Sequence, residues 1–308
     1  MAGGTITTGN TARMLQEGLN EVFGQAYDEH EVQWDKIFDS NTSRKNFEVD
    51  QQFEGFTLAP VKPEGDSISY DTQTEGFTPK YPNLTYGKGF IVTEEALEDN
   101  LYGVFNRRAR SLAFSMNQTK EVVGANVLNN AFDGSFQMQD GDGVALLSTA
   151  HPNGPTDTGT FSNKLAVDAD LTEASLEDLL IQINQATDPR GLRIALQGIR
   201  LIVPPTLMFV AERILGSTLQ NDTANNAVNA VKVMQSVQDG FTTNNFLTDD
   251  DAWFIKTNSP DGMKYFTRRD VRFEQDMDFG TSNMRFKATE RYSFGWSDAR
   301  GMYGTSGS

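Results

Sequence analysis

Residues 47–92 read FEVDQQFEGFTLAPVKPEGDSISYDTQTEGFTPKYPNLTYGKGFIV. In the first part, residues 47–58, apolar and polar side chains alternate until the register shifts at Gly55, which is typical of a strand with a glycine-marked bulge. The last part, residues 84–92, alternates in the same way from Leu84 to Val92. The sequence therefore predicts two strands that form a long two-stranded ribbon.

The segment between these strands, residues 59–83, is the predicted tip of the ribbon. Pro and Gly residues interrupt it, and only Ile68 and Tyr70 alternate with polar neighbours. A ribbon with so few apolar groups is at best marginally stable alone, so we expect another surface, such as that of a neighbouring subunit, to cover it. The tip residues expected at this contact are Glu64, Asp66, Ile68, Tyr70, Asp71 and Glu75.

A long helix is predicted after the ribbon. Thr93 is a suitable N-cap, and apolar residues then recur three or four apart as far as residue 130. An unbroken helix from residue 95 to residue 130 would be about 50 Å long, which is more than a compact core of this size needs. Its basic cluster is Arg107, Arg108 and Arg110. These arginines form either a solvated or paired helix face or a contact with acids of another chain.

The rest of the chain mixes helices and strands. A short amphipathic helix is predicted for residues 11–27 and further helices for 172–186 and 206–215. A buried strand is predicted for 199–203, and residues 217–247 are predicted to be a mobile excursion that contains a short stretch of strand. Short strands are expected at 253–255, 263–266, 271–273 and 286–296, the last with an apolar face that Glu290 interrupts. The pattern indicates an α+β or α/β protein.

The composition excludes several classes of function. The chain of 308 residues contains no Cys and 2 His, His30 and His151, so neither sulfur-ligated zinc nor a multi-histidine metal centre is possible. A net charge of -16 opposes tight binding to nucleic acid phosphates. The longest apolar run, residues 201–211, is broken by two prolines, and no secretory signal opens the chain. We therefore expect neither secretion nor a membrane span.

The sequence contains no recognisable catalytic pattern. The loop at residues 140–143 resembles the start of a calcium loop, but His151 stands where the twelfth-position acid is needed. Neither of the phosphate-binding motifs GxGxxG and GxxxxGK(S/T) occurs. No plausible GxSxG serine accompanies His151. An extended ribbon, a long helix and no catalytic constellation together indicate a subunit of an assembly.

Several stretches resemble a known family. They are LLSTAHP at 146–152, LTEASLEDLL at 171–180, LIVPPTLMFVAERIL at 201–215, LTDDDAWFIKT at 247–257 and RFKATERYSFGWSDARGMYG at 285–304. Together with the order of elements, they are similar to the major capsid proteins of tailed bacteriophages with the HK97-type fold, in particular the Mu-type major head subunits. The resemblance implies an α+β capsid fold with an N-terminal arm, an extended E-loop hairpin, a long spine helix, a P domain and an A domain.

The resemblance also implies a domain organisation. Residues 1–46 would be the N-terminal arm, 47–92 the E-loop, 93–169 the first part of the P domain with the spine helix, 170–255 mainly the A domain, and 256–308 the return to the P domain. Some members of the family crosslink a Lys to an Asn of another subunit. Lys62 and Lys80 lie in the ribbon, but no partner Asn can be matched, so that chemistry is not expected here.

The function implied by the resemblance is self-assembly into the icosahedral head that encloses the phage genome. The expected partners are other copies in hexamers and pentamers, with decoration, scaffolding and portal proteins, and non-specifically packaged double-stranded DNA. No enzyme activity, cofactor, metal or membrane is expected, and the location is the virion, with the host cytoplasm during assembly. The acidic ribbon tip is expected to meet Arg107, Arg108 and Arg110 of another subunit.

Two alternatives remain open at this point. The chain is also compatible with an encapsulin-like or other phage-derived shell, which would hold enzyme cargo in place of a genome. From a different class, a soluble hydrolase would use His151 with Asp or Ser partners.

Overall fold

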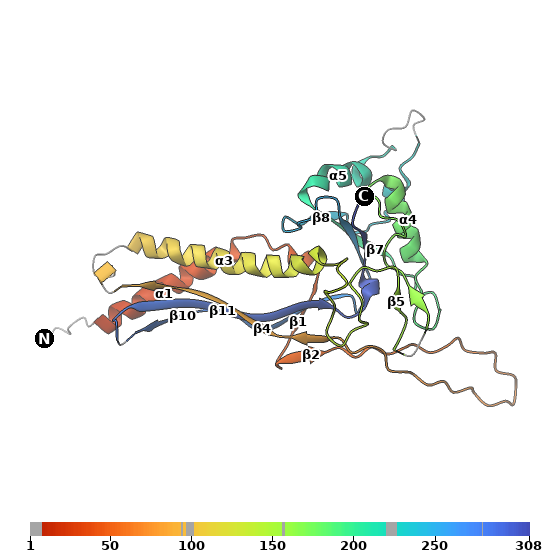
Figure 1. Cartoon of the computed structure of the whole chain (residues 1–308), viewed down its shortest axis with the longest axis horizontal. Coiled ribbons are helices and arrows are strands. Elements are labelled where there is room, and N and C mark those ends of the chain that lie inside the picture. Colours follow the sequence, from red (N-terminus) through yellow and green to blue (C-terminus); the bar gives the residue numbers. More distant parts are fainter. Residues whose placement is uncertain (1–7, 94, 97–101, 156–157, 220–226, 279) are drawn as a thin grey trace. The chain divides into compact units, whose positions relative to one another are not determined.

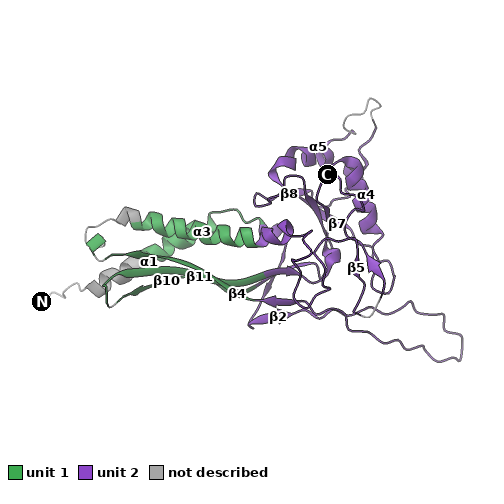
Figure 2. Ribbon diagram, in the orientation of Figure 1, with its two compact units in different colours: residues 1–33, 83–123, 267–293 green, residues 34–82, 124–266, 294–308 purple. Residues whose placement is uncertain are grey.

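The computed structural model describes residues 8–93, 95–96, 102–155, 158–219, 227–278 and 280–308. The chain divides into two compact units, each built from three separate segments (Figure 2). Unit 1 contains residues up to 33, 83–123 and 267–293, and unit 2 contains 34–82, 124–266 and 294–308. Each unit thus depends on contacts between segments that are distant in the sequence.

Unit 1 packs two helices against a sheet. Its elements are α1 (Thr8–Asp28), β4 (Leu84–Val92) and most of α3 (Tyr102–Asn129), β10 (Met263–Met277) and β11 (Met284–Trp296). In this sheet β11 lies between β10 and β4. The short strand β1 (Asp39–Thr42) is next to β10 in the strand order and belongs by sequence to unit 2. Phe23 of α1, Leu112 and Met116 of α3, and Ala288 of β11 form a buried cluster. The helices of Figure 1 therefore cover one face of the sheet by burying apolar side chains there.

The predicted helix of residues 11–27 and the predicted last strand are both confirmed. In β11 the even-numbered residues from Phe286 to Tyr292 are buried, while Arg285 and Lys287 are exposed. The predicted long helix is confirmed as α3 within the described residues, where its 28 residues correspond to about 42 Å. Residues 97–101 of that prediction lie outside the described residues.

Two predicted short strands are in fact one. Residues 263–266 and 271–273 belong to the single 15-residue strand β10. The polar residues between them, Arg268 and Asp270, continue the strand and do not form a turn. Their side chains are exposed on one face, while Val271 and Phe273 pack against the core on the other. Alternating burial thus continues through a segment whose outward residues are charged.

Unit 2 has a four-stranded sheet of its own, in the order β12-β9-β7-β8. Its strands are β7 (Gly198–Val203), β8 (Phe241–Thr243), β9 (Trp253–Thr257) and β12 (Met302–Thr305). β8 is parallel to β7, whereas β9 is antiparallel to both β7 and β12. The core of this unit joins Leu201, Trp253, Ile255 and Tyr303 to the leucines of the next helix layer. β12 is a strand that the sequence pattern did not indicate.

Unit 2 contains the helices α4 (Glu173–Asn184), α5 (Met208–Gly216) and α6 (Ala230–Val233) and the turn η2 (Pro205–Leu207). α4 and α5 confirm the helices predicted for 172–186 and 206–215, whereas α6 lies within residues 217–247, where no helix was predicted. Thr172 is the N-cap of α4, and its side chain accepts a hydrogen bond from Ser175 N. Pro205 opens the turn before α5, where a missing N–H has no cost. The remaining short elements are η1 (Trp34–Lys36), β5 (His151–Pro152), β6 (Thr160–Phe161) and η3 (Ala299–Gly301).

The ribbon exists, but the pairing predicted for it is wrong. β2 (Phe47–Val49) pairs with β3 (Lys80–Pro82), and backbone bonds such as Gln52 N to Phe77 O (3.0 Å) continue the ladder toward the tip. The second predicted strand, β4, pairs with β11 instead, with Phe90 opposite Phe286. This pairing lets Phe90 stack on Phe286 and Tyr86 on Tyr292, at 4.8 and 4.5 Å between ring centroids. Burial of aromatic rings on β11 therefore decides the partner of β4.

Candidate assembly surfaces

The base of the ribbon is held in unit 2 by a buried polar network. Tyr81 is fully buried, its hydroxyl lies 2.6 Å from Ser297 Oγ, and its ring packs edge-on against Phe266. Asp50 accepts hydrogen bonds from Ser297 and Lys264. Burial raises the pKa of the Tyr81 hydroxyl, which keeps it a neutral hydrogen-bonding group. These contacts attach the base of the ribbon to the rest of unit 2.

Further out, a second set of contacts forms what we call the neck of the ribbon, made by Thr57, Asp71 and Arg190. The Asp71 carboxylate accepts hydrogen bonds from Thr57 N (2.9 Å) and Thr57 Oγ1 (2.7 Å) on the opposite arm. The Arg190 Nη1 lies 3.5 Å from the same carboxylate. The hydrogen bonds from Thr57, with a smaller contribution from Arg190, lower the pKa of Asp71 to about 2.

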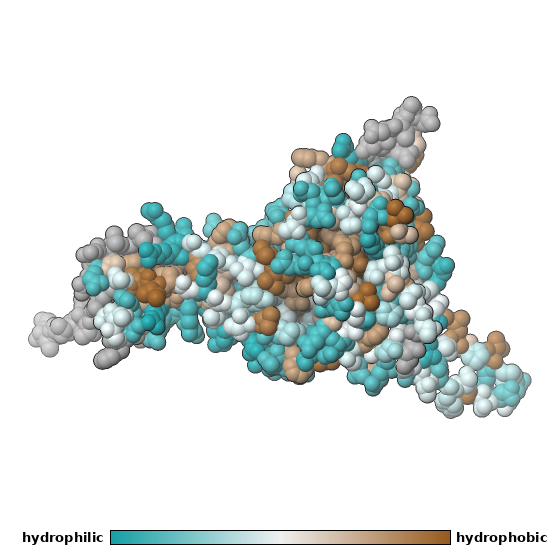
Figure 3. Space-filling model, viewed as in Figure 1, coloured by the Kyte–Doolittle hydropathy of each residue, from teal (hydrophilic) through white to brown (hydrophobic). Residues whose placement is uncertain are grey.

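The tip, residues 58–70, projects beyond the neck with its apolar side chains uncovered. The exposed fractions are 76% for Leu58, 93% for Val61, 64% for Ile68 and 94% for Tyr70. Figure 1 shows the two arms separating here, and they enclose a hollow of about 530 Å³. Figure 3 shows hydrophobic atoms on this projecting segment. An exposed group of large apolar side chains is typical of a surface that another protein covers.

The predicted site residues fall into two groups. Glu64, Asp66, Ile68, Tyr70, Asp71 and Glu75 are all exposed on the ribbon of unit 2. Arg107, Arg108 and Arg110 are exposed on α3 in unit 1. Within the first group Asp71 has partners in its own chain, so its carboxylate is less free than the sequence suggested.

The sequence interpretation missed Thr57 and Arg190. Arg190 lies in the segment Asp188-Pro189-Arg190-Gly191, which the sequence marks only as the end of a helix. Its contact with Asp71 joins residues 119 positions apart. No local pattern indicates such a distant contact.

His151 occupies a closed structural position. It is fully buried, its Nδ1 lies 2.6 Å from Asp142 Oδ2, and its Nε2 lies 3.1 Å from Asn163 Oδ1. The amide of Asn163 is oriented by bonds to the carbonyls of Leu146, Ala299 and Met302. Both ring nitrogens therefore face acceptor oxygens, and neither is available to a serine hydroxyl as a hydrolase mechanism requires.

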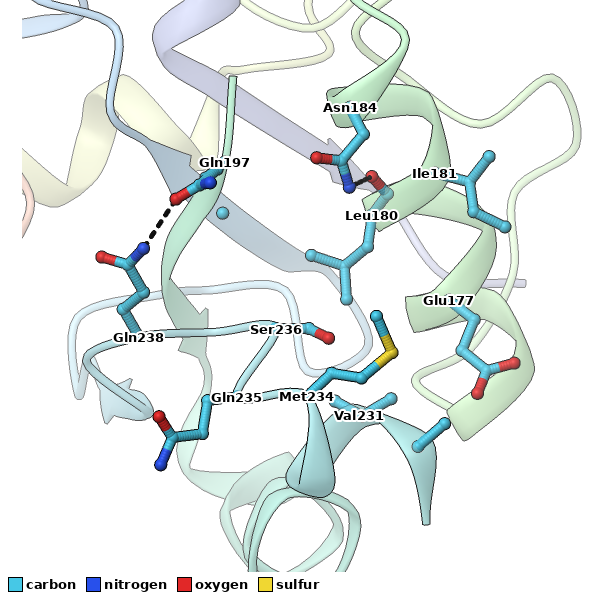
Figure 4. Close-up of a pocket in the computed structure, with 12 residues that line it drawn as sticks. Glu177, Leu180, Ile181, Asn184, Gln197, Val231, Met234, Gln235, Ser236 and Gln238 are labelled. Carbon is cyan, nitrogen blue, oxygen red and sulfur yellow. Dashed lines mark hydrogen bonds between the residues drawn. The ribbon is translucent and has the colours of Figure 1, made fainter. Parts of the chain in front are cut away.

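A groove lies between α4, α6 and the start of β7 (Figure 4). Its volume is about 470 Å³, and its rim carries Ile181 and Met234, which are 53% and 75% exposed. Gln238 Nε2 donates to Gln197 Oε1 at 2.7 Å on its polar side. Glu177 is the only ionisable side chain among the described residues that line it, so the groove does not pair two groups for acid–base chemistry.

No metal-binding cluster of three or more His, Cys, Asp or Glu occurs among the described residues. Within the same residues, none of the helices has the length and apolar character needed to cross a bilayer.

Glu290 forms a buried ion pair in unit 1. It is 1% exposed, and its Oε2 lies 3.3 Å from Lys120 Nζ and accepts a hydrogen bond from Tyr27 OH at 3.2 Å. Its Oε1 is buried, and none of the residues that the structure describes forms a hydrogen bond with it. Burial raises the pKa of Glu290, although Lys120 and Tyr27 act in the opposite direction. Glu290, which interrupts the apolar face of β11, thus links the sheet to α1 and α3 through polar contacts.

This pKa shift predicts a pH dependence of stability. Because the folded subunit keeps the Glu290 proton to a higher pH than the unfolded chain, the stabilisation from Glu290 is complete below its ordinary pKa of 4.5 and is lost as the pH rises through the raised value. We expect the difference in free energy of unfolding, wild type minus Glu290→Gln, to decrease with rising pH. Urea unfolding of the unassembled subunit at several pH values measures this difference. Glu29→Gln, which removes an exposed carboxylate, is the control. A difference that stays constant or increases would contradict this assignment.

The comparisons with known proteins identify the family. Residues 78–304 match the family model described as phage capsid protein, which is most of the chain. The chain therefore belongs to the phage capsid protein family. No curated protein matches the sequence.

Solved structures agree in fold at low sequence identity. The chain is similar to the capsid structure of the cyanophage P-SCSP1u, with 10% identity, a TM-score of 0.59, and coverage of 89% of this chain and 87% of that chain. It is also similar to the capsid of Myoviridae phage XM1, with 10% identity, a TM-score of 0.53 and coverage of 100% of both chains. A third structure is a virus-like particle from Pyrococcus furiosus, with 13% identity, a TM-score of 0.51 and coverage of 94% and 98%.

Family and fold together confirm the main prediction. The chain has the HK97-like fold of tailed-phage capsids and is a shell-forming major capsid protein, a structural protein of the virion. The Mu-type resemblance stays a prediction within this wider family.

Proposed function

We propose that this protein builds the phage head by placing the ribbon of each subunit on a neighbouring copy within hexamers and pentamers. The observation that supports this most is the uncovered tip, where Val61 and Tyr70 are more than nine-tenths exposed. Fully burying an apolar side chain is worth about 1.5–3 kcal/mol, so four such residues are a substantial source of assembly energy. Symmetric repetition of this contact multiplies its effect over the shell.

The same proposal assigns the parts of the fold. The ribbon of residues 47–82 is the E-loop, since β4 belongs to the sheet of unit 1. α3 is the spine helix, and together with β4, β10 and β11 it forms the main part of the P domain. The sheet β12-β9-β7-β8 with α4 and α5 supplies the A domain. Residues 1–46 are the N-terminal arm.

The electrostatics suit a container for double-stranded DNA. A net charge of -16 keeps packaged DNA from adhering tightly to the shell wall, so the contact with the genome is non-specific. The acidic tip residues Glu64 and Asp66 pair with Arg107, Arg108 and Arg110 of another subunit. Decoration, scaffolding and portal proteins are further partners, and assembly takes place in the host cytoplasm.

The role is structural and not catalytic. The engagement of both His151 nitrogens supports this, because it removes the one imidazole that a hydrolase mechanism was expected to use. A phage-derived compartment that holds protein cargo is the second candidate, since the chain shares its fold with the Pyrococcus furiosus virus-like particle.

Electron microscopy of the purified protein tests the proposal, with closed icosahedral shells or their capsomers as the expected result. A monodisperse monomer under all assembly conditions would contradict it. Particles isolated from the native source separate the two candidates: nuclease-protected double-stranded DNA is expected for a phage head, and a defined enzyme inside the shell would favour the compartment.

A further inference from the structure

We propose that Arg190 is the positioning residue of the assembly ribbon, which it holds at the neck so that the tip is presented to the neighbouring copy in a fixed direction. This inference rests on the proposed function of the ribbon. All of the contacts that support it lie within unit 2.

Hydrogen bonds within its own loop hold the backbone of Arg190 independently of the contacts of its side chain. Asp188 Oδ1 accepts hydrogen bonds from Arg190 N at 2.9 Å and from Leu192 N at 2.7 Å. Asp188 N donates in turn to Leu192 O at 2.8 Å, and Gly191 supplies the positive φ of +81° that closes this turn. A rigid loop after α4 therefore carries the guanidinium.

The Arg190 guanidinium contacts both arms of the ribbon, the outgoing arm before the tip (residues 47–57) and the returning arm after it (residues 71–82). Its Nη2 donates to Thr72 O at 2.7 Å, and its Nη1 lies 3.5 Å from both oxygens of Asp71 on the returning arm. Its Nε lies 3.9 Å from Glu54 Oε2 on the outgoing arm. The planar fork of an arginine makes such divergent contacts possible, which the single ammonium group of a lysine does not.

Asp71 connects the arm that Arg190 contacts to the opposite arm of the ribbon. The same carboxylate that faces Arg190 accepts the two hydrogen bonds from Thr57 on the other arm. Beyond Thr57 and Asp71, the hydrogen bonds of the described residues include none between the two arms, and the turn bond from Asp66 N to Pro63 O lies within the tip. The neck is thus the last point at which the body of unit 2 fixes the direction of the tip.

The energetic role follows from preorganisation. Without Arg190 the outer ribbon can swing about its paired base, and ordering it during assembly costs entropy. The contacts are partly exposed and individually weak, so their loss changes the folding of unit 2 little. We therefore expect an effect on assembly with almost none on the stability of the subunit.

The test compares Arg190→Ala, Arg190→Lys and the matched control Arg193→Ala, an exposed arginine of the same loop. For Arg190→Ala we expect an unchanged melting temperature of the unassembled subunit, faster amide exchange at Thr57 and Thr72, and a critical concentration for shell formation about tenfold higher. Arg190→Lys is expected to be intermediate, and Arg193→Ala to behave as wild type.

Unchanged amide exchange at the neck in Arg190→Ala, or an unchanged critical concentration, would overturn the inference. Shell formation by the wild type is measured in the same experiment. If the wild type forms no shells, the proposed function fails; if it forms shells and Arg190→Ala matches it in either readout, only the role of Arg190 fails.

Discussion

The double variant Ile68→Asp, Tyr70→Asp is expected to remain folded and to form no shells at concentrations where the wild type assembles. Both side chains are mostly exposed in the free subunit, so their replacement removes no packing from the core. In the shell we expect them to be buried on a neighbour, each contributing about 1.5–3 kcal/mol. Losing both contributions raises the critical concentration at least about 100-fold. Light scattering and electron microscopy over a concentration series measure this.

Ile68→Val and Tyr70→Phe together form the matched control, because they keep an apolar surface of similar shape. This control should assemble within a few-fold of the wild type. The melting temperature of each unassembled subunit shows whether folding is affected. Shells of the aspartate variant at the wild-type concentration would show that the tip is not an assembly contact.

A second large effect is expected for the triple variant Arg107→Glu, Arg108→Glu, Arg110→Glu. These residues are exposed on α3, so reversal of their charge leaves unit 1 folded. In the proposed contact the new glutamates would face the acidic ribbon tip of another copy, and like charges in close contact are strongly unfavourable. We expect no shells at low ionic strength and partial recovery at high salt, where the repulsion is screened.

A charge swap identifies the partners of these arginines. Adding Glu64→Lys and Asp66→Lys to the triple variant restores opposite charges at the proposed contact, and shell formation should recover in part. Asp71 is left unchanged because it belongs to the neck. Normal assembly of the triple variant alone would exclude this surface. Failure of the charge swap to recover any shells would assign the arginines a different partner.

Local patterns predicted the elements of the fold well. The boundaries of α4 follow from Thr172 as a cap and from the apolar spacing of its leucines, and both signals are contained in one short segment. The end of β7 is equally local, because Pro204 and Pro205 cannot continue a ladder. β11 is recognisable from alternation alone, since every second side chain from Met284 to Tyr292 is buried.

Strand partners could not be predicted in the same way. β4 and the outgoing arm of the ribbon both alternate, and nothing within residues 47–92 states that β4 pairs with β11, about 200 residues later. The true partner of β2 is β3, which follows Pro79, ends at Pro82 and has no apolar alternation, so its sequence is typical of a loop. Charged outward residues likewise disguise the middle of β10.

The sequence predicted which residues form the candidate contact surface, but not the contacts of the neck that hold this surface in place. An apolar and acidic segment too poor in contacts to fold alone indicates that Ile68 and Tyr70 need a cover, and both are indeed exposed in the free chain. The neck depends on Thr57 and Arg190, which meet Asp71 only in three dimensions. Sequence therefore indicated where a contact is needed, and the structure indicates what holds it in place.

The central claim, that the tip is buried on another copy, can be measured at one position. Because the chain has no cysteine, Tyr70→Cys introduces a single thiol. Its rate of labelling by a maleimide dye should be high in the unassembled subunit, at least about tenfold lower in intact shells, and high again after the shells are denatured. Equal labelling rates in subunits and intact shells would contradict the account.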